Sequence, residues 1–332
     1  MAFRIQLPLS TCVLLASTLA APSAFAGPVA DPHATNAQRA QAARKTAANN
    51  PLCSYDLLSS YYWEIGDVTG ALASGRVGGR INASSMMNVG SSSKWLYSSY
   101  VVEKRGDVPA DVPFLTFTSG YSHFDSTQCL DSGTVEQCFP GERDLDEAAG
   151  HVFHYDGGHM QQHAIDIGLG PLSNRPLATE VRTGVGNELS LQYTKPQLAG
   201  GAKTSASNYA IFLRKLLVDS PTPLAMGALL GSHAVCTLPG PDCNASADVL
   251  VPEAWHYSLG HWIEDDPTTT PTMNFAYSSP GLFGFYPWVD ADRKLYGILA
   301  RQSGNLVEQD AGYVSAQCGR LLRLAWKTAT PQ

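Results

Sequence analysis

The sequence contains few charged residues and no cluster of basic ones. Only 15% of its 332 residues are charged, and 29 acidic against 22 basic side chains give a formal net charge of −7. Surfaces that bind the phosphate backbone of nucleic acids are basic, so we predict no nucleic-acid partner. Low charge together with 30 Gly and 21 Pro residues is typical of a loop-rich globular protein, and it argues against a coiled coil or a disordered chain.

The sequence also lacks an apolar run long enough to cross a membrane permanently. The apolar segment from Leu7 to Ala21 follows one basic residue, ends at a proline and precedes the small-residue triplet Ala24-Phe25-Ala26. This pattern is typical of a secretory signal peptide. We therefore expect residues 1–26 to be a signal peptide that is cleaved between Ala26 and Gly27. The mature protein would then be exported, to the periplasm or the medium.

Cys-x-x-Cys spacings are absent, which argues against a zinc site built on such motifs. Six cysteines remain after residue 26, and an even number in an exported chain indicates disulfide bonds. The sequence does not determine which cysteines pair. Two pairs of cysteines, however, are close together in sequence and bracket turn residues. The first and the last of the six would then pair with one another. The expected disulfides are Cys129–Cys138, Cys236–Cys243 and Cys53–Cys318.

The pattern of the remaining chain predicts a leader and one domain. Residues 27–50 are rich in Ala, Asn and Gln with little apolar periodicity, so we expect a flexible leader or a frayed helix. Strand patterns near both ends of residues 51–330 and helical patterns between them predict a single domain. We place an α/β lobe at about 51–82 plus 250–330 and a mainly helical lobe at about 83–249, with a cleft between them as the default site.

Individual segments follow from apolar periodicity and turn residues. The expected strands lie within 65–77 and at 255–263, 283–289 and 295–301. The expected helices lie at 53–63, from 91 onward, and at 160–169, 208–218 and 307–327. Residues 106–150 form a long stretch with little periodicity, which we expect to shape the cleft. Neither an internal repeat nor a low-complexity block occurs.

A Ser-x-x-Lys motif, Ser91 to Lys94, opens one of the expected helices. Residues three apart on a helix share a face, so the Ser91 hydroxyl and the Lys94 amine would point into the same space. A serine hydroxyl becomes a strong nucleophile only when a neighbouring base takes its proton, and a lysine is such a base only when its pKa is held down. Taken alone, the motif is equally typical of a serine-rich helix cap with a solvated lysine.

Two further segments contain chemically useful residues. Tyr155 precedes the expected helix at 160–169, and a tyrosine flanked by a cationic lysine loses its proton more easily and becomes a general base. The segment Tyr277–Asp290 reads as a strand whose Gly281 permits close approach of a substrate carbonyl.

In this order the three segments resemble the serine β-lactamase and penicillin-binding-protein superfamily, most closely its class C branch and related esterases. The family's Ser-x-x-Lys is matched by Ser91 and Lys94, its Tyr-x-Asn by Tyr155 with Gly157 at the asparagine position, and its Lys/His-Thr/Gly-Gly by Ser279-Pro280-Gly281. The likeness runs from about residue 63 to 326. It implies an α/β (α+β) fold in which an antiparallel sheet is flanked by N- and C-terminal helices, with an inserted, mainly helical lobe.

The resemblance also implies roles for these residues. Ser91 would be the acylated nucleophile, Lys94 would share its proton, and Tyr155 would be the base in acylation and would activate water in deacylation. The backbone N–H groups of Ser91 and Leu282 would form the oxyanion hole. Gly157, Ser279 and Gly281 would contact the substrate, and the family requires no metal or organic cofactor.

Two departures from the family pattern bear on the substrate. Ser279 replaces a cation that binds the carboxylate of β-lactams, and Gly157 replaces an amide side chain that hydrogen-bonds acyl-amide substrates. Both changes favour small carboxylic esters. Hydrolysis of a D-amino-acid peptide or a β-lactam amide is the alternative, and a non-catalytic binding or sensor domain of the same fold is a third interpretation.

Other classes of site have less support in the sequence. His151, His154, His159 and His163 invite a metal site, because His159 and His163 are four apart on an expected helix, but no glutamate lies between them. We therefore predict no metal. An α/β-hydrolase needs Gly-x-Ser-x-Gly, which is absent. The sequence leaves the natural substrate and the oligomeric state open.

Overall fold

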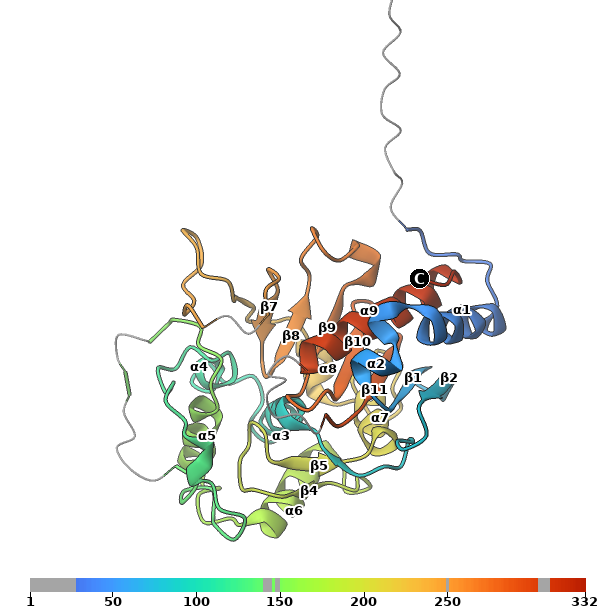
Figure 1. Ribbon diagram of the computed structural model, residues 1–332. Helices are drawn as coiled ribbons and strands as arrows, with labels where there is room; N and C mark the ends of the chain where they lie inside the picture. The colour runs from blue at the N-terminus through green and yellow to red at the C-terminus, as the bar shows by residue number, and fades with distance from the viewer. Residues whose placement is uncertain (1–27, 140–144, 147–149, 249–250, 304–310) are drawn as a thin grey trace, which may run out of the picture.

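The computed structural model describes residues 28–139, 145–146, 150–248, 251–303 and 311–332. The expected signal peptide at 1–26 lies outside these residues. The described part of the chain is a mixed α/β structure in which a large antiparallel sheet packs between helices (Figure 1). The fold class predicted from the sequence is confirmed.

The main sheet joins the two ends of the chain. It has eight strands in the order β2-β1-β11-β10-β9-β8-β7-β6, and each neighbouring pair is antiparallel. The strands are β1 (Tyr61–Asp67), β2 (Gly70–Val77), β6 (Val235–Cys236), β7 (His256–Ser258), β8 (His261–Glu264), β9 (Ala276–Ser278), β10 (Tyr286–Asp290) and β11 (Tyr296–Ala300). Because β1 pairs with β11, the first and last strands of the domain lie side by side.

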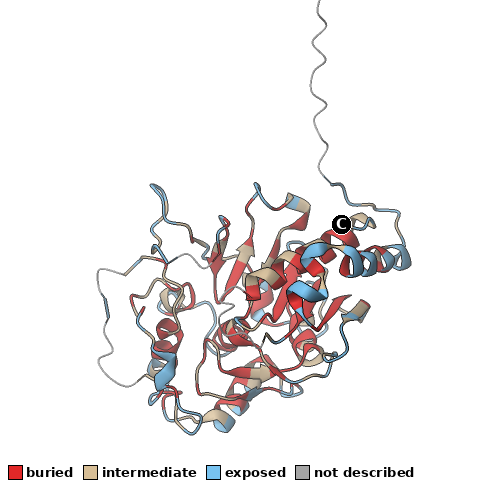
Figure 2. Cartoon of the chain, viewed as in Figure 1, coloured by how far each residue is buried: buried red, intermediate tan, exposed pale blue. Residues whose placement is uncertain are grey.

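Helices cover both faces of the centre of this sheet. On one face, the Arg323 guanidinium of α9 (Ala311–Thr328) lies 4.9 Å from the ring of Trp288 on β10. On the other, Tyr296 pairs with Val289 and so points away from Trp288, toward α7 (Ala206–Arg214). Strands β10 and β11 are buried along their whole length, and Figure 2 shows buried residues concentrated in the sheet and the helices next to it.

The expectation of a flexible leader at 27–50 is wrong from residue 36 onward. Residues Asn36–Asn49 form helix α1, which begins with a capping box from Thr35 and packs along α9. Arg39 Nη1 donates hydrogen bonds to the carbonyls of Trp326 and Lys327 at 2.8 and 2.9 Å, and so satisfies carbonyls at the end of α9. The buried residues are four alanines and Thr46, which permit close packing but produce almost no hydrophobic periodicity.

Helices and a small sheet form the middle of the chain. The helices are α3 (Ser93–Arg105), α4 (Val112–Leu115), α5 (Gly158–Asp166), α6 (Asn174–Val185) and α8 (Ala225–Leu229), and the sheet, in the order β3-β5-β4, consists of β3 (Met87–Asn88), β4 (Gln192–Tyr193) and β5 (Ala202–Thr204). Neither α6 nor this sheet was predicted. The chain also returns to the main sheet earlier than the expected residue 250, because β6 pairs with β7.

Three predicted segments differ in detail. Residues 53–63 contain only short helical turns, η1 (Pro51–Cys53) and α2 (Tyr55–Leu58), before β1 begins. The strand expected at 255–263 is a hairpin, β7–β8, which turns at Gly260 with a φ of +73°. The segment 277–290, expected to be one strand, is likewise the hairpin β9–β10, in which β9 lies inside the sheet between β8 and β10.

All three expected disulfides are present in the structure: Cys53–Cys318, Cys129–Cys138 and Cys236–Cys243. The first links η1, near the start of the domain, to α9 across 265 residues, whereas the others close short loops with sequence separations of 9 and 7. A cross-link stabilises a fold mainly by restricting the unfolded chain, and the effect grows with loop length.

Removal of the long-range disulfide is therefore expected to destabilise the protein most. The Cys53→Ala/Cys318→Ala variant should lose about 3–5 kcal/mol of unfolding free energy, and the Cys236→Ala/Cys243→Ala control about 2 kcal/mol. Chemical denaturation followed by far-UV circular dichroism measures both values. Equal losses in the two variants would contradict the expectation.

Candidate active site

Ser91 and Lys94 lie where the sequence predicts, at the start of helix α3. A short 3₁₀ turn, Gly90–Ser92, leads into the helix, and Gly90 has a φ of +52°. Lys94 Nζ lies 2.9 Å from Ser91 Oγ and donates a second hydrogen bond of 2.9 Å to the carbonyl of Ala199. The predicted pair therefore exists, and a backbone carbonyl from a distant segment fixes the direction of the lysine.

The environment of Lys94 weakens its hold on a proton. Its side chain is 5% exposed, and loss of hydration lowers the pKa of Lys94 to about 7, although the carboxylate of Asp156 acts in the opposite direction. At neutral pH about half of the molecules hold this amine uncharged. An uncharged amine next to a serine hydroxyl is able to accept the hydroxyl proton.

Tyr155 comes from the loop before α5 and completes the cluster. Lys94 Nζ lies 4.6 Å from the centre of its ring, and its hydroxyl hydrogen-bonds with Ser91 and Trp262. Burial raises the pKa of Tyr155 to about 12, and the two hydrogen bonds offset only part of this rise. The sequence led us to expect a tyrosine that ionises easily. Burial acts against such ionisation, because desolvation outweighs the polar contacts of the phenol, and the role of Tyr155 as a base stays a prediction.

The loop between β9 and β10, which holds the third motif, is fastened to the start of α3. Ser279 Oγ donates a hydrogen bond of 3.0 Å to the carbonyl of Ser91, and Ser92 Oγ donates one of 2.5 Å to the carbonyl of Ser279. Tyr209 on α7 adds a hydrogen bond from its hydroxyl to the carbonyl of Ser92 at 2.8 Å. These contacts hold the loop and the Ser91 turn together as one unit.

Two glycines allow this close approach. A Cβ atom on Gly281 would collide with the carbonyl oxygen of Val89, and one on Gly90 would lie 2.8 Å from the backbone nitrogen of Leu282. The Leu282 N–H is thus brought next to the Ser91 turn. This placement agrees with the expected oxyanion hole, in which the two N–H groups of Ser91 and Leu282 would face one substrate oxygen.

A cavity of about 310 Å³ opens beside these groups. Its lining includes Ser91, Lys94, Gly157 and Leu282, together with a wall formed by residues 194–201. The volume is at the lower end of the range for small-molecule sites. Ser279 and Gly281 are not among the described residues that line the cavity. Ser279 fastens its loop to the Ser91 turn, and substrate contacts of both residues stay a prediction.

Gly157 lines the cavity, but the ring of Phe124 occupies the space beside its Cα atom. A Cβ atom on Gly157 would lie 2.9 Å from Cδ1 of Phe124. A larger side chain here would therefore displace the phenyl ring. An apolar ring thus lies next to the position where the family pattern places an amide.

Of the four histidines considered as metal ligands, His159 and His163 are buried, and both make hydrogen bonds within the protein. His159 Nδ1 hydrogen-bonds with Ser119 Oγ at 2.6 Å, its Nε2 lies 3.1 Å from the carbonyl of His154, and burial lowers its pKa to about 3. His163 Nδ1 hydrogen-bonds with the Tyr97 hydroxyl at 2.7 Å. Within the described ranges, no group of three His, Cys, Asp or Glu side chains could hold a metal ion.

Sequence reasoning missed several residues of this site. Ala199 and Trp262 bind the lysine and the tyrosine, Asp156 influences the charge of the lysine, and Phe124 fills the space beside Gly157. A carbonyl or a ring from a remote segment leaves no local signal. The pair Gly200-Gly201 before β5 was the one usable hint, because paired glycines indicate close approach of the backbone.

Comparison with known proteins supports the fold through structure alone. Neither a protein-family model nor a curated protein matches the sequence. FmtA from Staphylococcus aureus superposes with a TM-score of 0.55 at 12% identity, covering 90% of each chain. An octameric penicillin-binding protein homologue from Pyrococcus abyssi gives 0.51 at 13% identity, over 79% of this chain and 74% of that one. A D-stereospecific amidohydrolase from Streptomyces gives 0.50 at 14%, over 84% and 99%.

These similarities show that the chain has the fold of the β-lactamase and penicillin-binding-protein-like structures. They do not distinguish a class C branch from its relatives. No helix in the described ranges has the length and apolar character needed to cross a membrane.

Proposed function

We propose that this protein is an exported serine hydrolase that acts through an acyl-enzyme on Ser91, with small carboxylic esters as substrates. One observation carries the proposal: a buried lysine with a pKa lowered to about 7 lies 2.9 Å from a serine hydroxyl that faces a cavity. The fold is that of known β-lactamase-like structures, and three disulfides support export to an oxidising compartment.

We divide the proton roles between Lys94 and Tyr155 according to the pKa of each group. Uncharged Lys94 takes the proton of Ser91 while Oγ bonds to the substrate carbonyl carbon, and the carbonyl electron pair moves onto its oxygen. We assign this step to Lys94 rather than Tyr155, because deprotonation of Tyr155 at neutral pH is far less favourable. The leaving alkoxide then takes a proton from the Tyr155 phenol, which recovers one from the Lys94 ammonium.

The remaining steps use the same groups. The N–H groups of Ser91 and Leu282 would stabilise the negative oxygen of each tetrahedral intermediate, an effect of about 3–4 kcal/mol per donor. In deacylation a water molecule attacks the acyl carbon and gives its proton to Lys94. The Ser91 oxygen then regains this proton from the Lys94 ammonium as the carboxylic acid leaves.

The choice of esters follows from the cavity. Its volume of about 310 Å³ suits a small substrate. Phe124 occupies the space where an amide side chain would bind an acyl-amide substrate. Esters also react more readily than amides, because resonance stabilises the amide bond and its nitrogen must be protonated before it leaves.

Hydrolysis of a D-amino-acid peptide or a β-lactam amide is the second candidate. It is favoured by the similarity in fold to a D-stereospecific amidohydrolase. A non-catalytic domain is the third interpretation, and the presence of all three proton-handling groups in one cluster argues against it.

Intact-mass analysis tests these interpretations directly. The protein is exposed briefly to a panel of p-nitrophenyl esters and penicillins and then acid-quenched. We expect a mass increase of one acyl group from the esters, on the peptide that contains Ser91. Adducts from penicillins alone would support the amide interpretation, and the absence of any adduct or turnover would support a binding domain.

Loss of the Tyr155 hydroxyl should slow catalysis without unfolding the protein. We expect Tyr155→Phe to lower kcat for an alkyl ester such as ethyl butyrate about 100-fold, because its alkoxide leaving group needs a proton and a positioned proton donor contributes that much. Tyr257→Phe is the matched control: Tyr257 is also buried, its ring lies 5.7 Å from that of Tyr155, and its hydroxyl has no hydrogen-bond partner among the described residues. Full activity in Tyr155→Phe would overturn its assigned role.

A further inference from the structure

One wall of the cavity contains an unpaired cation. Residues 194–199, between β4 and β5, contribute Thr194, Lys195, Gln197 and Ala199 to the lining. Lys195 is partly exposed, and its ammonium group has no hydrogen bond or ion pair with any residue that the structure describes. The described lining contains two lysines and neither Asp nor Glu, although the whole chain has a net charge of −7. Because Lys94 has a lowered pKa and interacts with the carboxylate of Asp156, the positive charge of the described lining rests mainly on Lys195.

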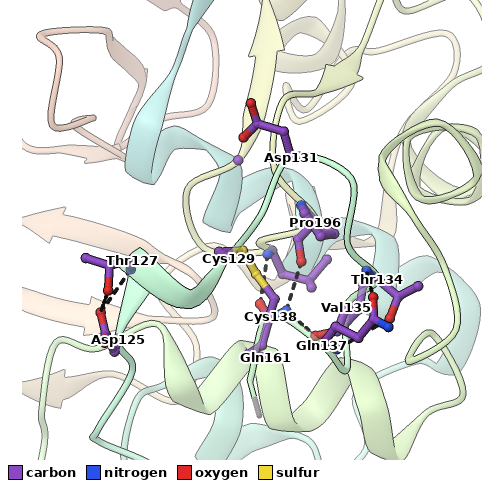
Figure 3. The surroundings of a disulfide bond; sticks show 12 residues. Asp125, Thr127, Cys129, Asp131, Thr134, Val135, Gln137, Cys138, Gln161 and Pro196 are labelled. Atoms are coloured by element: carbon purple, nitrogen blue, oxygen red, sulfur yellow. Dashed lines mark hydrogen bonds between the residues drawn. A yellow bond between two sulfur atoms is a disulfide. The ribbon is translucent and has the colours of Figure 1, made fainter.

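This wall is held firmly in place. The buried amide of Gln161 on α5 donates hydrogen bonds of 2.8 Å to the carbonyls of Pro196 and Val135 and accepts one from the Leu198 N–H. Figure 3 shows Gln161 between Pro196 and the loop that the Cys129–Cys138 disulfide closes. The backbone that follows Lys195 is thus fixed, because Pro196 and Leu198 both hydrogen-bond with Gln161.

A second anchor lies on the other side of the lysine. Asn174 Nδ2 donates hydrogen bonds to the carbonyls of Thr194 and Asp131 at 3.0 and 2.7 Å. At the end of the segment, the carbonyl of Ala199 accepts the hydrogen bond from Lys94. The position of the Lys195 backbone is therefore tied to the position of the reacting groups, and only its side chain remains free to meet a substrate.

Neutral hydrogen-bonding groups line the same cavity as this cation. The Gln197 amide folds over the Gly200 turn, where a Cβ atom on Gly200 would lie 3.4 Å from its Nε2. Asn88, at the end of β3, lines the same cavity. An ammonium accompanied by amide donors and without a nearby carboxylate in the described lining matches the needs of a bound carboxylate.

We propose that Lys195 determines specificity by binding a carboxylate group of the substrate, so that the preferred esters are anionic. This inference rests on the proposed hydrolase function. In the family's third motif a cation binds the substrate carboxylate, and Ser279 replaces that cation here. Lys195 would supply a positive charge from a different segment. Because the lysine is partly exposed, its attraction for a carboxylate is screened by salt.

Matched esters test the inference. The anionic probes are mono-p-nitrophenyl glutarate, with the carboxylate on the acyl side, and 4-(pentanoyloxy)benzoate, with it on the leaving side; p-nitrophenyl pentanoate is the neutral reference. The wild-type protein should favour one anionic ester relative to the neutral ester at low salt, and the preference should shrink as salt is added. Lys195→Gln should lower the anionic-to-neutral ratio of kcat/KM about 10- to 100-fold, the size of a charge-assisted hydrogen bond.

Two further variants sharpen the result. Lys195→Glu should reverse the charge preference. This variant should favour a cationic ester, p-nitrophenyl 5-(trimethylammonio)pentanoate, over the neutral ester. Lys294→Gln makes the same change in net charge at an exposed site in the β10–β11 hairpin, and should leave the ratio as in the wild type. Thermal unfolding verifies that each variant is folded.

The outcomes separate this inference from the proposed function. An unchanged ratio in Lys195→Gln, or no preference for either anionic ester in the wild type, overturns the role of Lys195 even if Ser91-dependent hydrolysis of the neutral ester is observed. If no ester is hydrolysed and Ser91 acquires no adduct, the hydrolase function itself is wrong.

Discussion

Replacement of Ser91 by alanine is expected to lower kcat/KM for p-nitrophenyl butyrate by at least about 10⁴-fold. Without the hydroxyl no acyl-enzyme forms, and only substrate binding and the oxyanion donors remain to accelerate attack by water. Steady-state hydrolysis measures the loss, and intact-mass analysis should show no acyl adduct. The change is small in volume, so the unfolding free energy should stay close to that of the wild type.

A serine on the same helix provides the control. Ser99 is buried on α3, and its hydroxyl has no hydrogen-bond partner among the described residues. Ser99→Ala should therefore keep wild-type turnover. If Ser91→Ala retained more than about 1% of the activity while folded, hydrolysis would proceed at another group, and the acyl-enzyme proposal would fail.

The second large effect is expected at Lys94. Lys94→Met keeps an unbranched side chain of similar length in the buried site but removes the base, so turnover should fall about 10³-fold. Lys104→Met, on the exposed part of the same helix, is the control and should be close to the wild type. Comparable turnover in Lys94→Met and the control would assign the base to another residue.

The lowered pKa of Lys94 predicts the pH dependence. Because the uncharged amine is the active form and the pKa is about 7, kcat/KM should rise with pH to a plateau above pH 8 and fall about tenfold per unit below pH 6. The carboxylate of Asp156 raises this pKa, so Asp156→Asn should move the midpoint to lower pH. A profile that is flat between pH 5 and 8, or a midpoint that moves upward in Asp156→Asn, would contradict the assignment.

The part of the site that the sequence predicted is the part that local geometry sets. Ser91 and Lys94 are three residues apart at a helix start, so one backbone conformation brings the hydroxyl and the amine together wherever the helix lies in the fold. The short disulfides Cys129–Cys138 and Cys236–Cys243 follow in the same way, since nearby cysteines meet with little loss of chain entropy.

Errors arose where packing outweighed local pattern. The alanine-rich segment 36–49 looked like a flexible leader, because alanine contributes little to a hydrophobic period, yet it is a helix held by α9. The segment 277–290 looked like one strand, because its aromatic residues mask the turn between β9 and β10.

The sequence by itself determined which functional groups this protein has, the order of its three motifs and the antiparallel α/β class of its fold. Only the tertiary structure decided their charge states and their neighbours. Burial lowers the pKa of Lys94 and raises that of Tyr155, and it is a property of the whole fold rather than of any segment. Likewise Lys195 acquires its place in the cavity from Gln161 and Asn174, which lie far from it in sequence and reach it only after the chain has folded.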